Sequence, residues 1–235
     1  MSIEQLKSEI EKLKNPEKIP IYQNFFKTGK GEYAEGDIFY GLSILQSRGI
    51  AKKYFSTISL PKLQTLLKSK IHEERLIALE ILNFKYENSD EKNKEQIVSF
   101  YLKNTKNINN WDLVDTSAPY ILGDFLLKKN RNVLYKLAQS KSLWEKRISI
   151  ISTFAFIKQN QFQDTLRISE ILLSDKHDLI QKAVGWMLRE AGKKEINVLK
   201  DFLKTYYKAM PRTTLRYAIE KFPEEERKKY LKGEI

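Results

Sequence analysis

The sequence predicts an all-α fold built from stacked helical pairs. Apolar residues recur at helical spacing in nearly every segment, and no segment shows sustained alternation with a period of two. Short polar, proline or glycine breaks separate these segments, and similar segments recur at a nearly constant interval. The 235 residues are enough for a substantial core. We therefore expect one HEAT-like helical-repeat domain over residues 1–235, with a concave basic groove.

The first half of the chain contains six predicted helices. The segment 3–14 is amphipathic and charged, which distinguishes it from a signal peptide. Ser59 and Pro61 are residues that open helices, and the run Asn88-Ser89-Asp90 separates two helical patterns. With these breaks, the predicted helices are 3–14, 37–54, 59–69, 72–85, 91–104 and 111–128.

The second half contains seven more. The pair Ser174-Asp175 precedes one helix, while Gly192 and Pro211 mark two further breaks. The predicted helices are 133–139, 143–158, 162–173, 178–191, 195–206, 211–221 and 223–231.

One N-terminal segment interrupts the periodicity. Phe25 to Asp37 reads FFKTGKGEYAEGD and contains three glycines and two lysines. Exposed backbone amides and lysines suit a phosphate-contacting loop, and the same composition is typical of a flexible connector. A P-loop is excluded because the segment has no Gly-Lys-Ser/Thr ending.

A repeat is visible in four similar segments: HEERLIALEIL from His72, WEKRISIISTF from Trp144, LIQKAVGWMLR from Leu179 and TTLRYAIEKF from Thr213. Each carries one basic anchor, in order Arg75, Arg147, Lys182 and Arg216. The intervals between these anchors are 72, 35 and 34 residues, so one repeat is expected in the first gap, centred on Trp111. This length, without the tetratricopeptide consensus, favours HEAT-like hairpins.

Equivalent positions of stacked repeats lie along one surface. The anchors and Trp111 are therefore expected to form a ladder, with Trp111, Asp115, Arg147 and Trp186 facing one groove. The alternative for both tryptophans is a core position, since large aromatic side chains dominate helix packing.

Three acidic residues of this region have structural interpretations. Asp115 is either a functional carboxylate or a helix N-terminal residue that interacts with the helix dipole or with Arg147. Asp112 is interpreted as a structural or helix-start residue, and Asp124 as a solvent-facing residue or a salt-bridge partner.

Composition limits the function classes. The 42 Lys and Arg residues outnumber the 30 Asp and Glu, and the net charge of +12 favours a polyanionic partner, most often nucleic acid. Cysteine is absent and only two histidines occur, so we expect neither a metal nor another cofactor. No apolar run approaches the roughly 20 residues that span a bilayer. We expect a cytoplasmic, nucleoid-associated monomer without membrane contact.

Three separated blocks carry a resemblance to a known family. WDLVD from Trp111 with the following SAPYILGD, WEKR from Trp144, and KAVGWMLRE from Lys182 resemble the AlkD-like DNA alkylation repair glycosylases, as does the C-terminal MPRTTLRYAIEKFPEEERKKYL. The resemblance extends from about Phe25 to the C-terminus. It implies a HEAT-like solenoid that releases N3- and N7-alkylated purines from double-stranded DNA.

The resemblance also implies roles for individual residues. Asp115 matches the catalytic aspartate, Trp111 and Trp186 match two aromatic contacts to the lesion nucleotide, and Arg147 matches the active-site arginine. DNA-backbone contacts are expected at Arg75, Lys182, Arg189 and Arg216.

The chemistry of such lesions suits this set of residues. An alkylated purine carries a positive charge and leaves as a neutral base, so a strong general acid is not required; a carboxylate near the sugar stabilises the oxocarbenium ion. Three alternatives remain: a non-catalytic DNA-binding solenoid for distorted or branched DNA, a protein-binding scaffold, and an RNA-reading repeat, which a ladder of mostly Arg and Lys disfavours.

Overall fold

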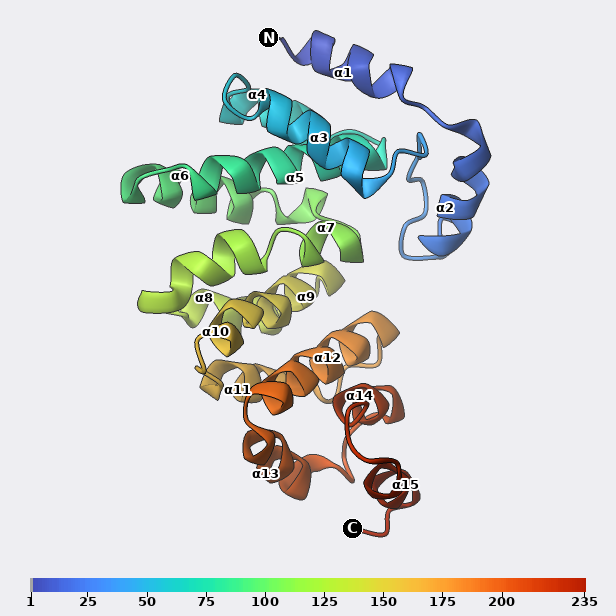
Figure 1. The fold of residues 1–235 in the computed structure, drawn as a ribbon, viewed down its shortest axis with the longest axis vertical. Coiled ribbons are helices and arrows are strands. Elements are labelled where there is room, and N and C mark those ends of the chain that lie inside the picture. Colours follow the sequence, from blue (N-terminus) through green and yellow to red (C-terminus); the bar gives the residue numbers. More distant parts are fainter. Residues whose placement is uncertain (1) are drawn as a thin grey trace. The chain divides into compact units, whose positions relative to one another are not determined.

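A computed structural model describes residues 2–235 and is built of helices (Figure 1). No β-strand forms in these described residues; an isolated parallel bridge joins Ile38 and Ile71. The predicted all-α fold is therefore confirmed. The chain divides into two compact units, Met1–Ser117 and Ala118–Ile235, and each is described by itself. The single domain expected over 1–235 stays a prediction.

The first unit is built around one long helix, α5. Helices α3 and α4 pack against α5, and α1 packs against α3 (Figure 1). The core includes Leu6 and Ile10 from α1, Leu63 from α4 and Ile77 from α5, which are all fully buried. The elements are α1 (Ile3–Lys12), η1 (Pro16–Lys18), α2 (Ile19–Phe25), α3 (Ile44–Tyr54), α4 (Leu60–Leu67), α5 (His72–Glu87), α6 (Glu91–Lys103), η2 (Thr105–Asn107) and α7 (Trp111–Asp115).

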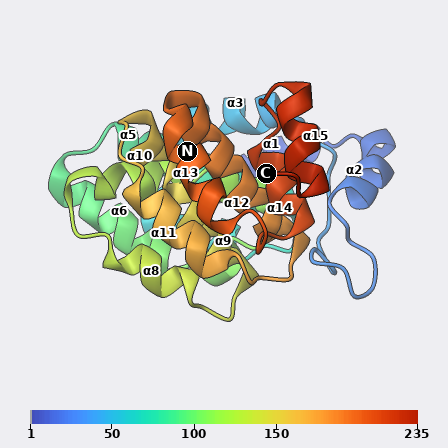
Figure 2. The same ribbon diagram turned by 90° about the horizontal axis from the view of Figure 1, so that it is seen from below.

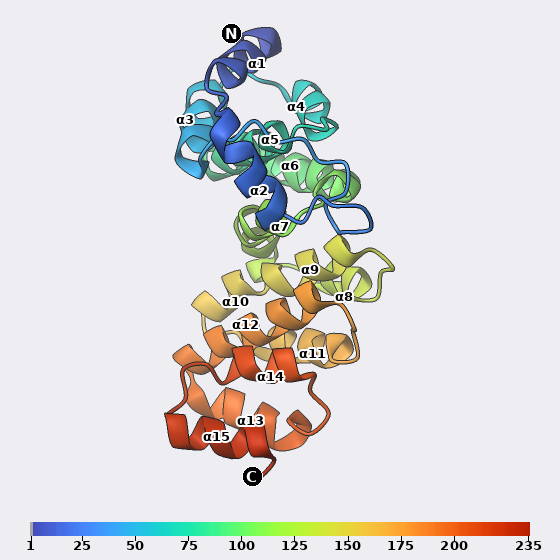
Figure 3. The ribbon, with the colours of Figure 1, turned by 90° about the vertical axis from the view of Figure 1, so that its right-hand side faces the viewer.

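The second unit is built around α12, which packs against α9, α11, α13 and α14 (Figure 3). Gly185 allows α12 to approach α14 closely, because the Cβ of any other residue there would lie only 2.5 Å from Tyr217 Cβ. The elements are η3 (Pro119–Gly123), η4 (Leu126–Lys128), α8 (Asn132–Ala138), α9 (Leu143–Ser152), α10 (Phe154–Lys158), α11 (Gln163–Leu172), α12 (Asp178–Lys194), α13 (Ile196–Tyr206), α14 (Arg212–Ala218) and α15 (Glu224–Lys232).

Two glutamates in the first turn of α5 bind residues that precede α3 in the chain. The Glu73 carboxylate accepts hydrogen bonds from the backbone amides of Tyr40, Gly41 and Leu42 at 2.8–3.2 Å. Glu74 forms an ion pair with Lys7 of α1 at 2.8 Å. The Glu73 contacts hold residues 40–42 outside any helix, so the helix predicted over 37–54 begins only at Ile44, after the capping box of Ser43 and Gln46.

The helix predicted over 111–128 is wrong in its length. It divides into α7, a π-helical turn at η3 and a 3-10 turn at η4. The hydroxyls of Thr116 and Ser117 donate to the carbonyls of Asp112 and Leu113 at 2.7 and 2.6 Å, and Pro119 has no N–H to continue the helix. Competing hydroxyl bonds also accompany the break in the predicted helix 143–158, at Thr153, whose hydroxyl donates to the carbonyl of Ile150 at 2.7 Å.

Helix α2 was not predicted. It begins with Ile19 and Pro20, and proline is favourable in a first turn. A long loop follows α2 (Figure 2), and after it Ile38 forms a bridge with Ile71. Among the described residues, no helix is both long and apolar enough to span a membrane.

Candidate functional site

Helix α7 carries the first predicted pair on one face. Asn110 caps it, its Oδ1 accepting from the Trp111 amide at 2.8 Å. Trp111 and Asp115 lie four residues apart, so their side chains project from the same side of the helix. Both are half-buried. Asp115 is the last residue of α7, which rules out the alternative that it is a helix N-terminal carboxylate.

Two aromatic residues at the C-terminal end of α2 contact Trp111, namely Phe25 and the C-cap residue Phe26. The Phe26 ring stacks on Trp111 with centroids 5.3 Å apart and planes 19° apart, and the Phe25 ring meets Trp111 edge to face at 5.6 Å. Phe26 is buried, whereas Phe25 is 59% exposed. Lys27 follows in a left-handed conformation with φ 57°, which turns the chain away at once. The first two residues of the segment Phe25–Asp37 therefore contact Trp111, so this part of the segment does more than connect two helices.

A buried cluster of four charged or ionisable side chains lies next to α7; we call it the His72 cluster. It consists of His72, Arg75, Asp37 and Asp112, whose side chains are 2–8% exposed. His72 Nε2 lies 2.7 Å from Asp112 Oδ2, and Arg75 Nη2 donates to Asp37 Oδ2 at 2.6 Å. His72 Nδ1 lies 3.4 Å from the same Asp37 oxygen. The interpretation of Asp112 as a structural residue is thereby confirmed.

The charges in the His72 cluster stabilise one another. Burial alone would lower the pKa of His72, but the Asp112 carboxylate and the hydrogen bonds to Asp112 and Asp37 raise it to about 9. Burial would raise the pKa of Asp37, but the hydrogen bond from His72 and the charge of Arg75 outweigh it, so this pKa lies below its ordinary value. At neutral pH the cluster therefore holds a cationic imidazole between two carboxylates.

The expectation that Arg75 contacts DNA phosphates needs correction. Its side chain is 3% exposed, and its guanidinium is held by Asp37 and by the carbonyl of Ser69 at 2.9 Å. A phosphate could reach it only after a buried ion pair broke, which is costly. Arg75 is a structural member of the His72 cluster.

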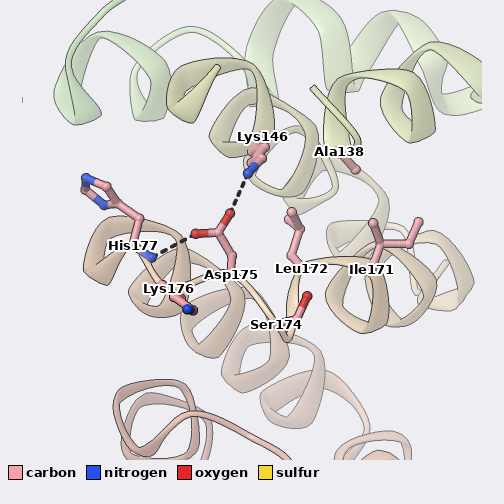
Figure 4. A pocket seen from close by; sticks show the side chains of 8 residues that line it. All are labelled: Ala138, Lys146, Ile171, Leu172, Ser174, Asp175, Lys176 and His177. Carbon is pink, nitrogen blue, oxygen red and sulfur yellow. Dashed lines mark hydrogen bonds and ion pairs between the residues drawn. The ribbon is translucent and has the colours of Figure 1, made fainter. Parts of the chain in front are cut away.

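In the second unit, Arg147 ties α9 to α12. Its Nη1 donates to the carbonyl of Leu179 at 2.6 Å, and the residue is 5% exposed. A parallel tie lies beside it: Lys146 forms an ion pair with Asp175 at 2.7 Å, and Asp175 accepts from the His177 amide at 2.8 Å (Figure 4). Lys146, Asp175 and His177, the N-cap residue of α12, line a pocket of about 570 Å³. Both ties fix where α12 begins.

One stripe of α12 contains Lys182, Trp186 and Arg189, all half-buried. Trp186 Nε1 donates to Glu190 at 3.2 Å, and its ring lies 6.2 Å from that of Phe154. Neither this tryptophan nor Trp111 is a fully buried core residue.

The basic residues differ in their surroundings. Lys182 pairs with Asp178 at 2.7 Å, and Arg189 pairs with Glu190 and Glu220. Arg216 on α14 is exposed. Phosphate contacts at Lys182 and Arg189 would therefore exchange an existing ion pair for a new one.

The helix starts also revise the repeat register. Arg147, Lys182 and Arg216 are each the fifth residue of their helices, and Arg75 is the fourth. The fifth residue of α7 is Asp115, whereas Trp111 is the first. In this register the carboxylate, and not the tryptophan, occupies the position that the other repeats fill with a basic residue.

The chain matches the family model described as DNA alkylation repair enzyme over residues 6–222. This chain belongs to that family. Its fold is similar to a predicted DNA alkylation repair enzyme from Enterococcus faecalis, with a TM-score of 0.69 and 14% identity, over 90% of this chain and 97% of that one. It is also similar to AlkD2 from Streptococcus mutans, with a TM-score of 0.56 and 16% identity, over 87% and 99% of the two chains. No curated protein matches the sequence.

The DNA alkylation repair family membership confirms the resemblance that the sequence blocks indicated. Sequence reasoning missed three residues beside α7: Phe25, Phe26 and His72. The signal available for the first two was an aromatic pair placed just after a proline-started helical turn. For His72 the signal was a histidine at the start of the HEER helix, in a chain whose two neighbouring segments supply the aspartates Asp37 and Asp112.

Proposed function

We propose that this DNA alkylation repair family member is a DNA glycosylase that excises N3- and N7-alkylated purines from double-stranded DNA. The single observation that carries the proposal is the pair on α7: a half-buried carboxylate and a half-buried indole on one face, beside an exposed phenyl ring. Such a pair suits a cationic nucleotide, and the net charge of +12 suits its DNA backbone.

Asp115 is the proposed catalytic carboxylate. When the bond between the sugar and an N7-alkylated purine breaks, both bonding electrons go to the base, whose positive charge is thereby neutralised. The sugar is left as an oxocarbenium ion, which a carboxylate stabilises electrostatically. The same carboxylate orients a water molecule, which adds to C1′ and loses a proton. Because the leaving base is neutral, the site needs no strong acid.

Trp111 recognises the charge of the lesion in this proposal. An indole face attracts a cation with about 0.5–2 kcal/mol, depending on how dry the contact is. A normal purine is neutral and gains none of this. Phe26 stacks on one face of the indole, and the exposed Phe25 beside it extends the aromatic surface offered to the nucleotide.

Residues of the second unit keep the roles that the resemblance implies. Trp186 contacts the lesion nucleotide, Arg147 acts as the active-site arginine, and phosphates bind near Lys182, Arg189 and Arg216. Of the last three, Arg216 is the most exposed. Phosphate contacts fix the position of DNA without reading its sequence. A monomeric state and a cytoplasmic location stay predictions of the sequence.

Release of 7-methylguanine from a methylated duplex tests the proposal. We expect the wild type to release the base under single-turnover conditions, and Asp115→Asn to do so about 100-fold more slowly. Asp124→Asn is the matched control, because Asp124 is an exposed aspartate close in sequence, and its rate should equal that of the wild type. A neutral lesion such as hypoxanthine should not be released.

The outcomes separate the remaining hypotheses. If the wild type binds duplex DNA with a steep salt dependence but releases no base, the non-catalytic DNA-binding alternative replaces the glycosylase. If it binds no DNA at all, the scaffold alternative replaces both.

A further inference from the structure

We propose that His72 is a positioning residue for Trp111 and Asp115, the pair of side chains on one face of α7. The contacts of its imidazole fix the orientation of both. The inference rests on the proposed function for its kinetic test, but its structural part can be tested without any enzymatic activity. The family comparisons assign no role to this residue.

The first route from His72 to α7 runs through Asp112. The imidazole Nε2 lies 2.7 Å from Asp112 Oδ2, and the other carboxylate oxygen accepts from the Leu113 amide at 2.9 Å. Asp112 follows Trp111 directly in the chain. A side chain held at both oxygens therefore determines the rotation of the first turn of α7, from which Trp111 and Asp115 project together.

The second route runs through stacked rings. The His72 ring stacks on Phe39 with centroids 4.6 Å apart and lies 4.9 Å from Phe26, which in turn stacks on both Phe39 and Trp111, at 5.0 and 5.3 Å. Phe26 and Phe39 lie at either end of the loop that follows α2, and His72 Nδ1 lies 3.4 Å from Asp37 near the end of the same loop. His72 thus holds α7 and the aromatic support of Trp111 in one arrangement.

The need for a positioning residue follows from the length of α7. A helix of five residues makes few internal hydrogen bonds and has little stability of its own. A buried ion pair is a weak source of stability compared with well-packed apolar side chains, but its fixed geometry selects one conformation. Displacement of a reacting group by about 1 Å can cost about 100-fold in rate, so a small rotation of α7 has a large effect.

Kinetics provide the first test, with the full chain and a 7-methylguanine duplex. We expect His72→Gln and Asp112→Asn each to lower the single-turnover rate about tenfold, while the Kd for undamaged duplex changes less than about twofold. The control is Glu74→Gln, which removes another buried carboxylate from the same turn of α5, one that pairs with the partly exposed Lys7 of α1. It should lower stability but leave the rate unchanged. Folded His72→Gln and Asp112→Asn proteins with the wild-type rate would overturn the inference, as would an equal rate loss in Glu74→Gln.

A spectroscopic test needs no enzymatic activity, and it can be made with either of two variants if one of them does not fold. The chain has three tryptophans, so 5-fluorotryptophan labelling gives three ¹⁹F resonances, which Trp111→Phe assigns. His72→Gln, or Asp112→Asn if the first does not fold, should shift or broaden the Trp111 resonance and leave those of Trp144 and Trp186 in place. An unmoved Trp111 resonance overturns the inference even if the wild type is inactive; a wild type that releases no base overturns only the proposed function.

Discussion

The buried imidazole of His72 makes the stability of the protein depend on pH in a range where few other groups titrate. The perturbation is a rise in pH from 6 to 10, which removes the proton from His72. Three charged groups face this ring: Asp37 from the N-terminal segment, Asp112 from α7 and Arg75 from its own helix. The two carboxylates favour the cation, and Arg75 opposes it.

The magnitude follows from the two pKa values. The pKa of His72 is about 9 in the folded protein and 6.5 in an unfolded chain, and each unit corresponds to about 1.4 kcal/mol. Because the folded value is the higher one, the stabilisation is fully present below pH 6.5 and disappears as pH rises through 9. The total is about 3 kcal/mol, of which about 2 kcal/mol is lost between pH 7 and pH 9. The tyrosines whose pKa values are raised lose protons only at higher pH.

Urea unfolding followed by circular dichroism at pH 6, 7, 8 and 9 measures this loss. The reference is the double variant His72→Gln/Asp112→Asn, in which a neutral hydrogen-bonding pair replaces the imidazole and the Asp112 carboxylate. His177→Asn is the second reference, because His177 is exposed and caps α12, and asparagine also caps helices. Between pH 7 and pH 9, the free energy of unfolding of the wild type and of His177→Asn should fall by about 2 kcal/mol more than that of the double variant. Parallel curves for all three proteins would refute the reasoning.

Three other predictions follow from individual contacts. Phe25→Ala should lower 7-methylguanine release about threefold to tenfold in single-turnover assays, while Ile21→Ala, one turn earlier and 64% exposed, should not; equal effects would contradict the contact. Lys182→Ala and Arg216→Ala should each reduce the slope of log K for duplex DNA against log salt by about 1, measured by fluorescence anisotropy. Gly185→Ala should destabilise the protein by about 1–3 kcal/mol in urea unfolding, because its Cβ would lie 2.6 Å from the Thr214 carbonyl oxygen. Gly49→Ala, in α3 with no atom within 4 Å of the new Cβ, should stabilise it.

Periodicity predicted most helices because their cores are built from residues at helical spacing. The prediction was wrong where side-chain hydroxyls and a proline compete with helical hydrogen bonds, at Thr116, Ser117 and Pro119. It also missed α2, which has only seven residues, too few to show a helical period, and buries none of them. These are local effects that a pattern of apolar residues does not contain.

The candidate site was predicted less completely than the fold. The blocks around Trp111, Arg147 and Trp186 were visible in the sequence because the family resemblance preserves their spacing. Arg75 matched the same repeat position, yet the structure places it in the interior, paired with an aspartate 38 residues before it. Spacing alone does not distinguish an exposed arginine from a buried one, because the partner that decides comes from a distant part of the chain.

The short length of α7 explains why contacts from outside the repeat determine the geometry of the α7 pair. Besides His72, Asn83 of α5 donates to the carbonyl of Thr116 at 2.8 Å, and the buried Tyr101 hydroxyl lies 3.0 Å from the Ser117 hydroxyl. The contacts of His72 and Asn83 reach α7 and its C-terminal end from α5, and that of Tyr101 from α6. Trp111 and Asp115 therefore depend on α5, α6 and the N-terminal segment for their orientation. Substitutions at Phe26 or Phe39, although distant in sequence, should therefore alter the chemistry proposed at Asp115 even though α7 itself is unchanged.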